Sequence, residues 1–145
     1  MGFRFPLASV LRLRESVEQR EELTLQRAQY ELERMRQRID ELTAELVTAG
    51  LQRELILLQS TEAYRLQDMQ AGIQIAKDTR EKLIETLESL KIARDHQVKV
   101  YQAARVSRGM LSDLRAEQRN AWELEQARIE QKWLDDVFAT RFQRG

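Results

Sequence analysis

The sequence of 145 residues has no cysteine, one proline, five glycines and only 6% aromatic residues. The absence of cysteine excludes disulfides, thiolate metal sites and a cysteine nucleophile, and it fits a reducing compartment. Few helix-breaking residues together with 33% charged residues are typical of coiled coils and long helices. The composition therefore argues against a globular domain with a deep core.

The charges balance, with 24 basic and 24 acidic residues. No net field draws the chain to nucleic acid or to an anionic bilayer. The longest uninterrupted apolar run, Leu55–Leu58, is far below the roughly 20 residues that a membrane-spanning helix needs. We expect a soluble or at most peripheral protein, with no direct membrane insertion and no nucleic-acid partner.

The chain opens with the basic and apolar stretch FRFPLASVLRLRE at residues 3–15. Arg12 and Arg14 interrupt its apolar run before that run reaches the length of a signal peptide, and no small-residue cleavage site follows. Pro6 suits the first turn of a helix, where its missing N–H would have no partner. This stretch predicts the start of a long amphipathic helix.

A heptad pattern follows, in which apolar residues recur at alternating steps of three and four. These seam positions are Leu25, Ala28, Leu32, Met35, Ile39, Leu42, Leu46 and Ala49. The pattern predicts a narrow apolar stripe that packs against one partner helix. Upstream, Val10, Leu13 and Val17 lie on a different line, so we expect a phase shift between Val17 and Leu25.

The first helix, expected at about residues 6–48, loses its pattern in a turn region at about 48–62. Thr48, Gly50, Ser60 and Thr61 are the clustered turn or capping residues of the interior. Residues 51–58 are apolar enough for a short helix across the turn. The chain is expected to reverse direction in this region.

The second helix is expected at about residues 62–141, with the whole chain, 1–145, forming one coiled-coil domain. Heptad spacing resumes in this helix, and Arg80 is the one polar residue at a seam position. The apolar seam residues are Leu66, Met69, Ile73, Ala76, Leu83, Leu87 and Leu90. At 1.5 Å per residue, the first helix would be about 60 to 65 Å long and the second well over 100 Å. The last third of the second helix would therefore lack a partner within the chain.

The residues of this sequence offer little for catalysis, metal binding or cofactor binding. His96 is the one histidine, and the isolated glycines form no phosphate-binding loop. Asp135 and Asp136 are adjacent, so on a helix their side chains point about 100° apart and are poorly placed to act together. Acidic residues follow directly after the arginines of the opening, which argues against nucleic-acid binding by those arginines. We expect no catalytic, metal or cofactor site, and no nucleotide binding by the chain alone.

The aromatic residues are the sequence's best candidates for recognition. Trp122 and Trp133 lie on the second helix, where packing against the first helix and binding a partner are both open. Phenylalanines lie near both ends of the chain, at Phe3, Phe5, Phe138 and Phe142. In a hairpin the two ends would meet, and we expect a joint surface able to enter an apolar collar on a larger protein.

Three parts of the chain resemble the FliJ family of the bacterial flagellar type III export apparatus. They are residues 3–15, the central heptads, and WELEQARIEQKWLDDVFATRF at residues 122–142. The resemblance covers essentially the whole chain. The opening, with its phenylalanines, leucines and arginines, and the EQKWLDDVF ending carry the resemblance beyond the heptads, because a heptad pattern does not require either segment. The DDVF segment departs slightly from the family's more usual acidic pair.

The resemblance implies an all-α fold, a long antiparallel two-helix coiled coil similar to the γ stalk of rotary ATPases. It also implies a non-enzymatic protein that occupies the central channel of the hexameric export ATPase FliI, promotes its assembly and contacts the export gate protein FlhA. A role in handling export chaperones is ascribed to the family as well. The implied location is the cytoplasmic face of the inner membrane at the flagellar base, by peripheral association.

Two sets of contact residues follow from this resemblance. The ATPase contact would lie at the paired ends, on Phe3, Phe5, Leu7, Leu11, Trp133, Leu134, Val137 and Phe138. The export-gate contact would lie nearer the turn, where position alone suggests Arg38, Leu42, Tyr64 and Met69.

Two other functions fit the same residues. The equivalent stalk of a virulence injectisome shares the hairpin, and genomic neighbours would separate the two systems. A generic coiled-coil scaffold has no ATPase partner, and it would form a stable parallel dimer instead of a helical monomer of high axial ratio.

Overall fold

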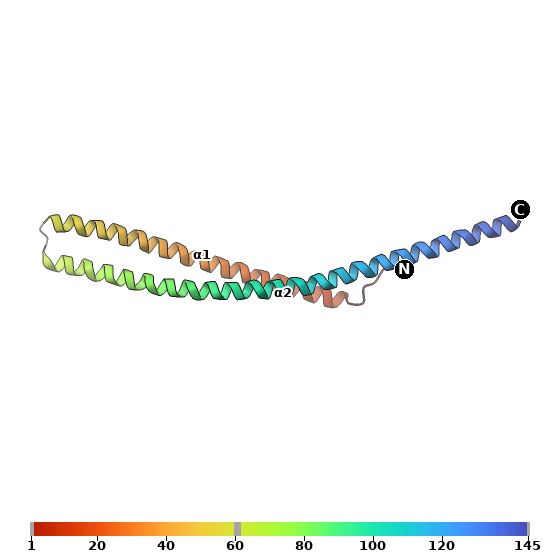
Figure 1. Ribbon diagram of the computed structural model, residues 1–145, viewed down its shortest axis with the longest axis horizontal. Coiled ribbons are helices and arrows are strands. Elements are labelled where there is room, and N and C mark those ends of the chain that lie inside the picture. The colour runs from red at the N-terminus through yellow and green to blue at the C-terminus, as the bar shows by residue number, and fades with distance from the viewer. Residues whose placement is uncertain (1, 60–61, 145) are drawn as a thin grey trace. The chain divides into compact units, whose positions relative to one another are not determined.

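The structure, a computed structural model, describes residues 2–59 and 62–144. Helix α1 spans Ala8–Leu58 and helix α2 spans Ala63–Arg144 (Figure 1). Neither described range contains a strand. The chain reverses between the helices, which pack against each other as an antiparallel hairpin. The predicted fold class, an all-α two-helix coiled coil, is confirmed.

Helix α1 begins two residues later than Pro6, the expected start. The Ala8 N–H donates to the Phe5 carbonyl at 3.1 Å, and the Leu11 N–H donates to the Leu7 carbonyl at 2.9 Å. Pro6 lies in the turn just before the helix. The sequence signal for this helix start was therefore correct to within two residues.

The expected end of the first helix, near residue 48, is wrong. Helix α1 continues to Leu58 and includes the segment that was expected to form a separate short helix. Gly50 is tolerated inside it, at a cost of about 1 kcal/mol relative to alanine. Ala49 and Ile56, on either side of this glycine, are half-buried, so packing of the helix continues past it. Of the four expected turn residues, Thr48 and Gly50 lie within α1, and Ser60 and Thr61 lie outside the described residues.

The chain divides into two compact units. We call Glu22–Val100 the hairpin unit, and Met1–Glu21 together with Tyr101–Gly145 the terminal unit. Each unit contains part of both helices.

The hairpin unit is held together by the predicted seam. Leu32, Ile39, Leu42 and Ile73 are buried, and the other predicted seam residues on both helices are half-buried. Each fully buried aliphatic side chain contributes on the order of 1.5 to 3 kcal/mol. Pairing of α1 with α2 is the main source of stability in this unit.

Arg80, the polar residue in the α2 seam, bonds to α1. Its Nε donates to the Thr43 hydroxyl at 2.8 Å, and that hydroxyl donates to the Ile39 carbonyl at 2.8 Å. A polar group inside a seam costs free energy unless it is hydrogen-bonded. This bond therefore explains how Arg80 can occupy a half-buried seam position.

In the terminal unit, the expected phase shift does not occur. Leu11 is buried while Val10 and Leu13 are exposed. Leu11 lies two heptads before Leu25, and Glu18 occupies the position between them. The heptad phase therefore continues unbroken from Leu11 to Leu25. One of its positions is a glutamate, and a pattern of apolar residues alone does not include that position.

Candidate partner-binding surfaces

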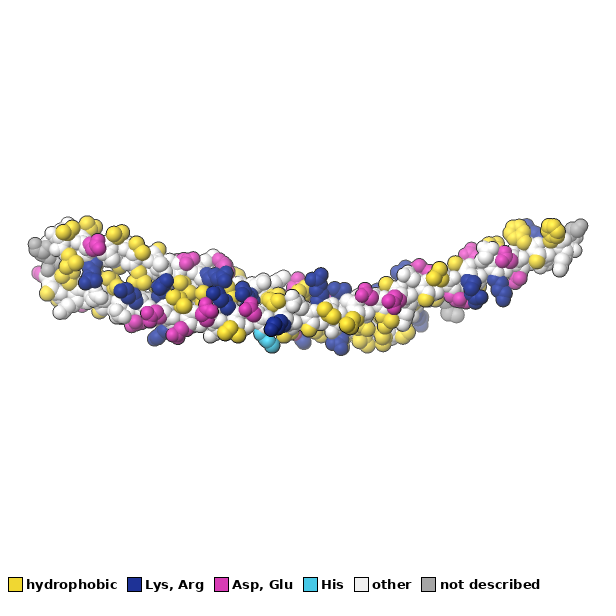
Figure 2. Space-filling model, in the orientation of Figure 1, with side chains coloured by type: hydrophobic (Ala, Val, Ile, Leu, Met, Phe, Trp, Pro, Cys, Tyr) yellow, Lys and Arg dark blue, Asp and Glu magenta, His cyan; other side chains and the backbone are white. Residues whose placement is uncertain are grey.

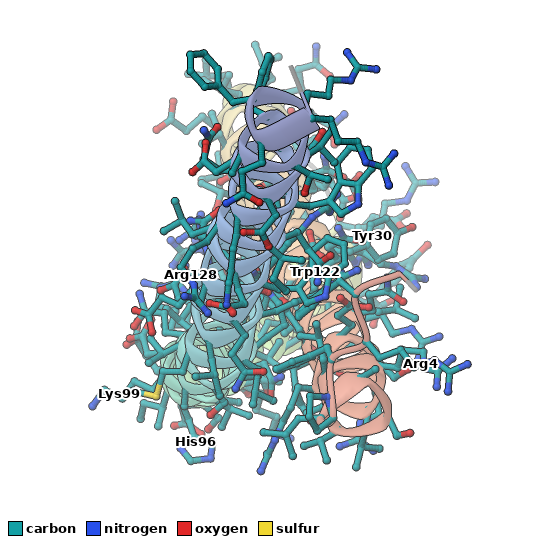
Figure 3. The ribbon with its side chains drawn as sticks, turned by 90° about the vertical axis from the view of Figure 1, so that its right-hand side faces the viewer. Arg4, Tyr30, His96, Lys99, Trp122 and Arg128 are labelled. Carbon is teal, nitrogen blue, oxygen red and sulfur yellow. The ribbon has the colours of Figure 1, made fainter. Side chains whose placement is uncertain are left out.

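The N-terminal segment packs against α2 well before the end of that helix. The rings of Phe3 and Trp122 have centroids 6.2 Å apart and planes inclined at 50°. That distance lies within the favourable range for aromatic pairs. Figure 3 places Trp122 on the side of α2 that faces the N-terminal segment. Trp122 is therefore a packing residue here.

An ion pair lies deeper in the same unit. Arg108 Nε donates to Glu18 Oε2 at 2.6 Å, and Arg108 Nη2 donates to Glu18 Oε1 at 3.3 Å. Only 16% of the Glu18 side chain and 30% of the Arg108 side chain are exposed. The bond from Arg108 lowers the pKa of Glu18 below its ordinary 4.5, against the opposing effect of burial. The same pairing raises the pKa of Arg108.

Past Trp122, helix α2 loses its partner. Every residue from 123 to 144 is exposed except Val137, which is half-buried. Trp133 is 62% exposed and Phe138 is 67% exposed. Figure 2 shows apolar side chains gathered towards this C-terminal end. The expectation that the last part of the second helix lacks an internal partner is confirmed. We call residues 123–144 the free end.

A shallow hollow marks one face of the free end. It has a volume of about 250 Å³ and is lined by Trp133, Asp136, Val137, Thr140 and Arg141. Apart from Arg141, these residues are spaced at i, i+3, i+4 and i+7, so they share one face of the helix.

The two chain ends do not meet, contrary to expectation. Phe3 reaches Trp122, whereas Phe138 and Phe142 lie further along α2 and are exposed. Helix α2 has 82 residues and helix α1 has 51, so α2 extends past the start of α1 within the terminal unit. The four phenylalanines therefore do not form a joint surface.

The residues expected to contact the ATPase separate into two groups. Phe5 and Leu11 are buried, and Phe3 is half-buried against Trp122. The residues that remain accessible are Leu7, Trp133, Leu134, Val137 and Phe138. Exposed Ile129 and Phe142 extend the second group along the free end. Ile129 was not among the residues predicted to contact the ATPase, although it lies four residues before Trp133.

The residues suggested for the export gate also differ in accessibility. Leu42 is only 4% exposed, because it packs in the hairpin seam. Met69 is half-buried, while Arg38 and Tyr64 are exposed. Arg38 donates to Glu41 at 3.2 Å. Only Arg38 and Tyr64 of these four are therefore freely accessible.

A second exposed apolar surface lies near the turn of the hairpin unit. Val47, Leu51, Leu55 and Leu58 follow one another along α1 at steps of four, four and three, and all are exposed. Figure 2 shows apolar side chains on this part of α1. This surface was not predicted, because Leu51, Leu55 and Leu58 were assigned to a turn region with a separate short helix.

The described residues contain no group of histidine and carboxylate side chains that could hold a metal ion. His96 is exposed, and Figure 3 shows it pointing away from the helices. Asp135 accepts a hydrogen bond from Gln131 Nε2 at 3.0 Å, within its own helix. Across the ranges that the structure describes, no helix is long and apolar enough to span a membrane.

Comparison with known proteins supports a single family. The family model described as "Flagellar FliJ protein" matches residues 3–145. Neither the curated proteins nor the solved structures gave a match.

Proposed function

Because this chain belongs to the flagellar FliJ family and is thus a component of the flagellar protein export apparatus, we propose that it acts as a non-enzymatic central stalk of the export ATPase. In this role it binds the hexameric ATPase FliI, promotes ring assembly and hydrolysis, and connects the ring to the gate protein FlhA. Handling of export chaperones is a further part of the proposal. Association with the gate would hold the protein at the cytoplasmic face of the inner membrane.

The observation that carries this proposal is the exposed aromatic free end. A helix that leaves Trp133 and Phe138 more than half exposed presents the kind of anchor residues that dominate protein interfaces. A single helix can also enter a narrower opening than a pair of helices can. The free end therefore suits an apolar collar inside a ring of subunits.

A stalk without catalytic groups can still change the activity of an enzyme. If it binds some conformations of the ATPase subunits more tightly than others, it shifts their populations by that difference in affinity. We assign this contact to Trp133, Leu134, Val137 and Phe138, and keep Leu7, an exposed residue in the turn before α1, as a further candidate. Buried Phe5 and Leu11 stabilise the terminal unit instead.

We assign the gate contact to the turn end of the hairpin unit. Arg38 and Tyr64 remain candidates because they are exposed, and Met69 is partly accessible. The exposed stripe from Val47 to Leu58 adds apolar area at the same end. Leu42 would act only indirectly, by holding α1 and α2 together.

The test adds the purified chain to the cognate ATPase and measures ring assembly and ATP hydrolysis. The double variant Trp133→Ala with Phe138→Ala should need at least about a tenfold higher concentration for the same stimulation. Truncating two aromatic anchors typically costs more than about 1.4 kcal/mol of binding free energy. Tyr30→Ala with Ile92→Ala is the matched control, because both side chains are exposed in the hairpin unit. Equal stimulation by the two double variants would refute a contact at the free end.

A further inference from the structure

The free end carries a stripe of apolar side chains that none of the described residues covers. Ile129, Trp133 and Val137 recur at steps of four and therefore lie on one face of α2. Ile129 is 50% exposed and Trp133 is 62% exposed. A stripe of this width matches a single helix, because two packed helices touch along a narrow line of side chains.

The hollow on this stripe has the form of a coiled-coil hole. In such packing, one side chain inserts among four residues of the facing helix. The hollow is lined by Trp133, Asp136, Val137 and Thr140, with Arg141 at its edge. The free end itself supplies a matching knob, since Ile129 is exposed on the same stripe just outside the hollow.

We propose that the free ends of two copies of this chain pair antiparallel, with Ile129 of each copy seated in the hollow of the other. This register places Trp133 opposite Trp133 of the second copy, and the two insertions occur together by symmetry. In a parallel pair the hollow would face the same hollow, and Ile129 of the second copy would lie about 11 Å away along the axis.

The charges beside the stripe fit the same antiparallel register. Lys132 and Asp136 lie on one flank, and Glu123 and Arg141 lie on the other. Antiparallel pairing brings Lys132 close to Asp136 of the second copy, and Glu123, which also accepts from Arg119 at 3.3 Å, close to Arg141. Glu130 also lies on the flank of Glu123 and Arg141, but in this register it is level with no charged residue on the facing flank. The four contacts of Lys132 with Asp136 and of Glu123 with Arg141 are between opposite charges, which favours a second copy as the occupant.

A charge pair away from the stripe is already satisfied within the helix. Arg128 donates to both carboxylate oxygens of Glu125, at 3.1 and 2.8 Å. Figure 3 shows Arg128 on the side of α2 opposite Trp122. Asp135 lies seven residues after Arg128, about two helical turns, and so shares its face. Arg128 and Asp135 therefore lie on the outer face and take no part in the proposed pairing.

The pair is expected to be weak and reversible. A seam of this length buries less than the roughly 1,200 Å² of a standard stable interface. Pairing would also cover Trp133, so a paired chain could not offer this face to the ATPase. This competition rests on the proposed function, whereas the pairing itself does not.

Sedimentation of the full chain over a range of concentrations tests the pairing. Lys132→Glu and Asp136→Lys should each raise the dissociation constant of the dimer at least tenfold, because each places like charges together. A one-to-one mixture of the two variants should recover dimerisation, since both contacts in the mixed pair are again opposite in sign. Asp135→Lys, one residue away on the outer face, should leave the dimer unchanged.

Failure of the mixture to recover dimerisation would overturn the proposal, as would an equal loss with Asp135→Lys. Both outcomes would indicate association through another face or through non-specific contacts.

The direction of pairing is tested by cross-linking, which is straightforward because the natural chain has no cysteine. The register places residue 126 opposite residue 140 of the second copy. A mixture of Gln126→Cys and Thr140→Cys chains should form a mixed disulfide on mild oxidation, and neither variant alone should. A disulfide between two Gln126→Cys chains would contradict the antiparallel register.

The cross-linked pair also separates this proposal from the proposed function. We expect the oxidised pair not to stimulate the export ATPase, and reduction to restore stimulation. Full stimulation by the oxidised pair would disprove the competition. If the reduced chains also fail to stimulate, the stalk function fails while the pairing stands.

Discussion

In the hairpin unit, Leu32, Ile39, Leu42 and Ile73 are buried between the two helices. In the terminal unit, the ion pair of Glu18 with Arg108 occupies part of the seam, and of the residues that the structure describes there only Phe5 and Leu11 are buried. Apolar burial is a large favourable contribution, whereas an ion pair must first offset the loss of its hydration. The same heptad spacing should therefore produce one strongly held region and one that opens more easily.

The difference has a functional consequence within the terminal unit. Regions with few buried apolar contacts open at low cost and are commonly those that bind partners. Here a weakly held pairing leads directly into a free end with exposed Trp133 and Phe138. The structure thus combines a hairpin seam with buried aliphatic residues and an end whose aromatic residues no described part of the chain covers.

The largest expected effect comes from breaking the seam of the hairpin unit. Leu32 is 2% exposed, and Leu32→Ala should lower the free energy of unfolding by roughly 2 to 4 kcal/mol, because it leaves a cavity between the helices. Leu13→Ala is the matched control in the terminal unit, where the leucine is 62% exposed. It should change the free energy by less than about 0.5 kcal/mol.

Urea unfolding followed by circular dichroism measures both variants. If Leu32→Ala and Leu13→Ala lower the free energy of unfolding equally, burial does not distinguish these two leucines.

A smaller effect, dependent on pH, is expected from Glu18→Gln in the terminal unit. Pairing with Arg108 lowers the pKa of Glu18 in the folded chain below 4.5. The pair therefore stabilises the fold at neutral pH, and this contribution disappears as the pH falls through the lowered pKa. Glu18→Gln should lower the melting temperature at pH 7 by less than Leu32→Ala does, and should have little effect at strongly acidic pH.

Thermal unfolding across the acidic range checks this prediction, with Glu22→Gln as an exposed control. If the difference in melting temperature between wild type and Glu18→Gln stays constant with pH, the ion pair does not contribute to the stability of the fold.

Much of the hairpin could be predicted from the sequence because apolar spacing determines which face of a helix is buried. The residues at seam positions of the hairpin unit were identified correctly, as was the unpaired end of α2. Helix α1 was expected to stop too early because Gly50 and Thr48 resemble a turn signal. Packing that half-buries Ala49 and Ile56 outweighs the local preference of glycine.

The polar part of the seam was not predicted. Glu18 and Arg108 lie at seam positions in sequence, but a pattern of apolar residues passes over them. A signal was present, since opposite charges at seam positions of two antiparallel helices can pair. The contact between Phe3 and Trp122 was also not predicted. It depends on which part of α2 lies beside the start of α1, and that alignment follows from the length of α1.

The most direct test of the account is hydrogen exchange of the full chain, measured alone and with the export ATPase. We predict slow exchange in the hairpin seam in both samples, and a gain in protection on binding that is concentrated in residues 123–144. A gain confined to Glu22–Val100, with the free end unchanged, would contradict the claim that the unpaired end of α2 is the ATPase-binding surface.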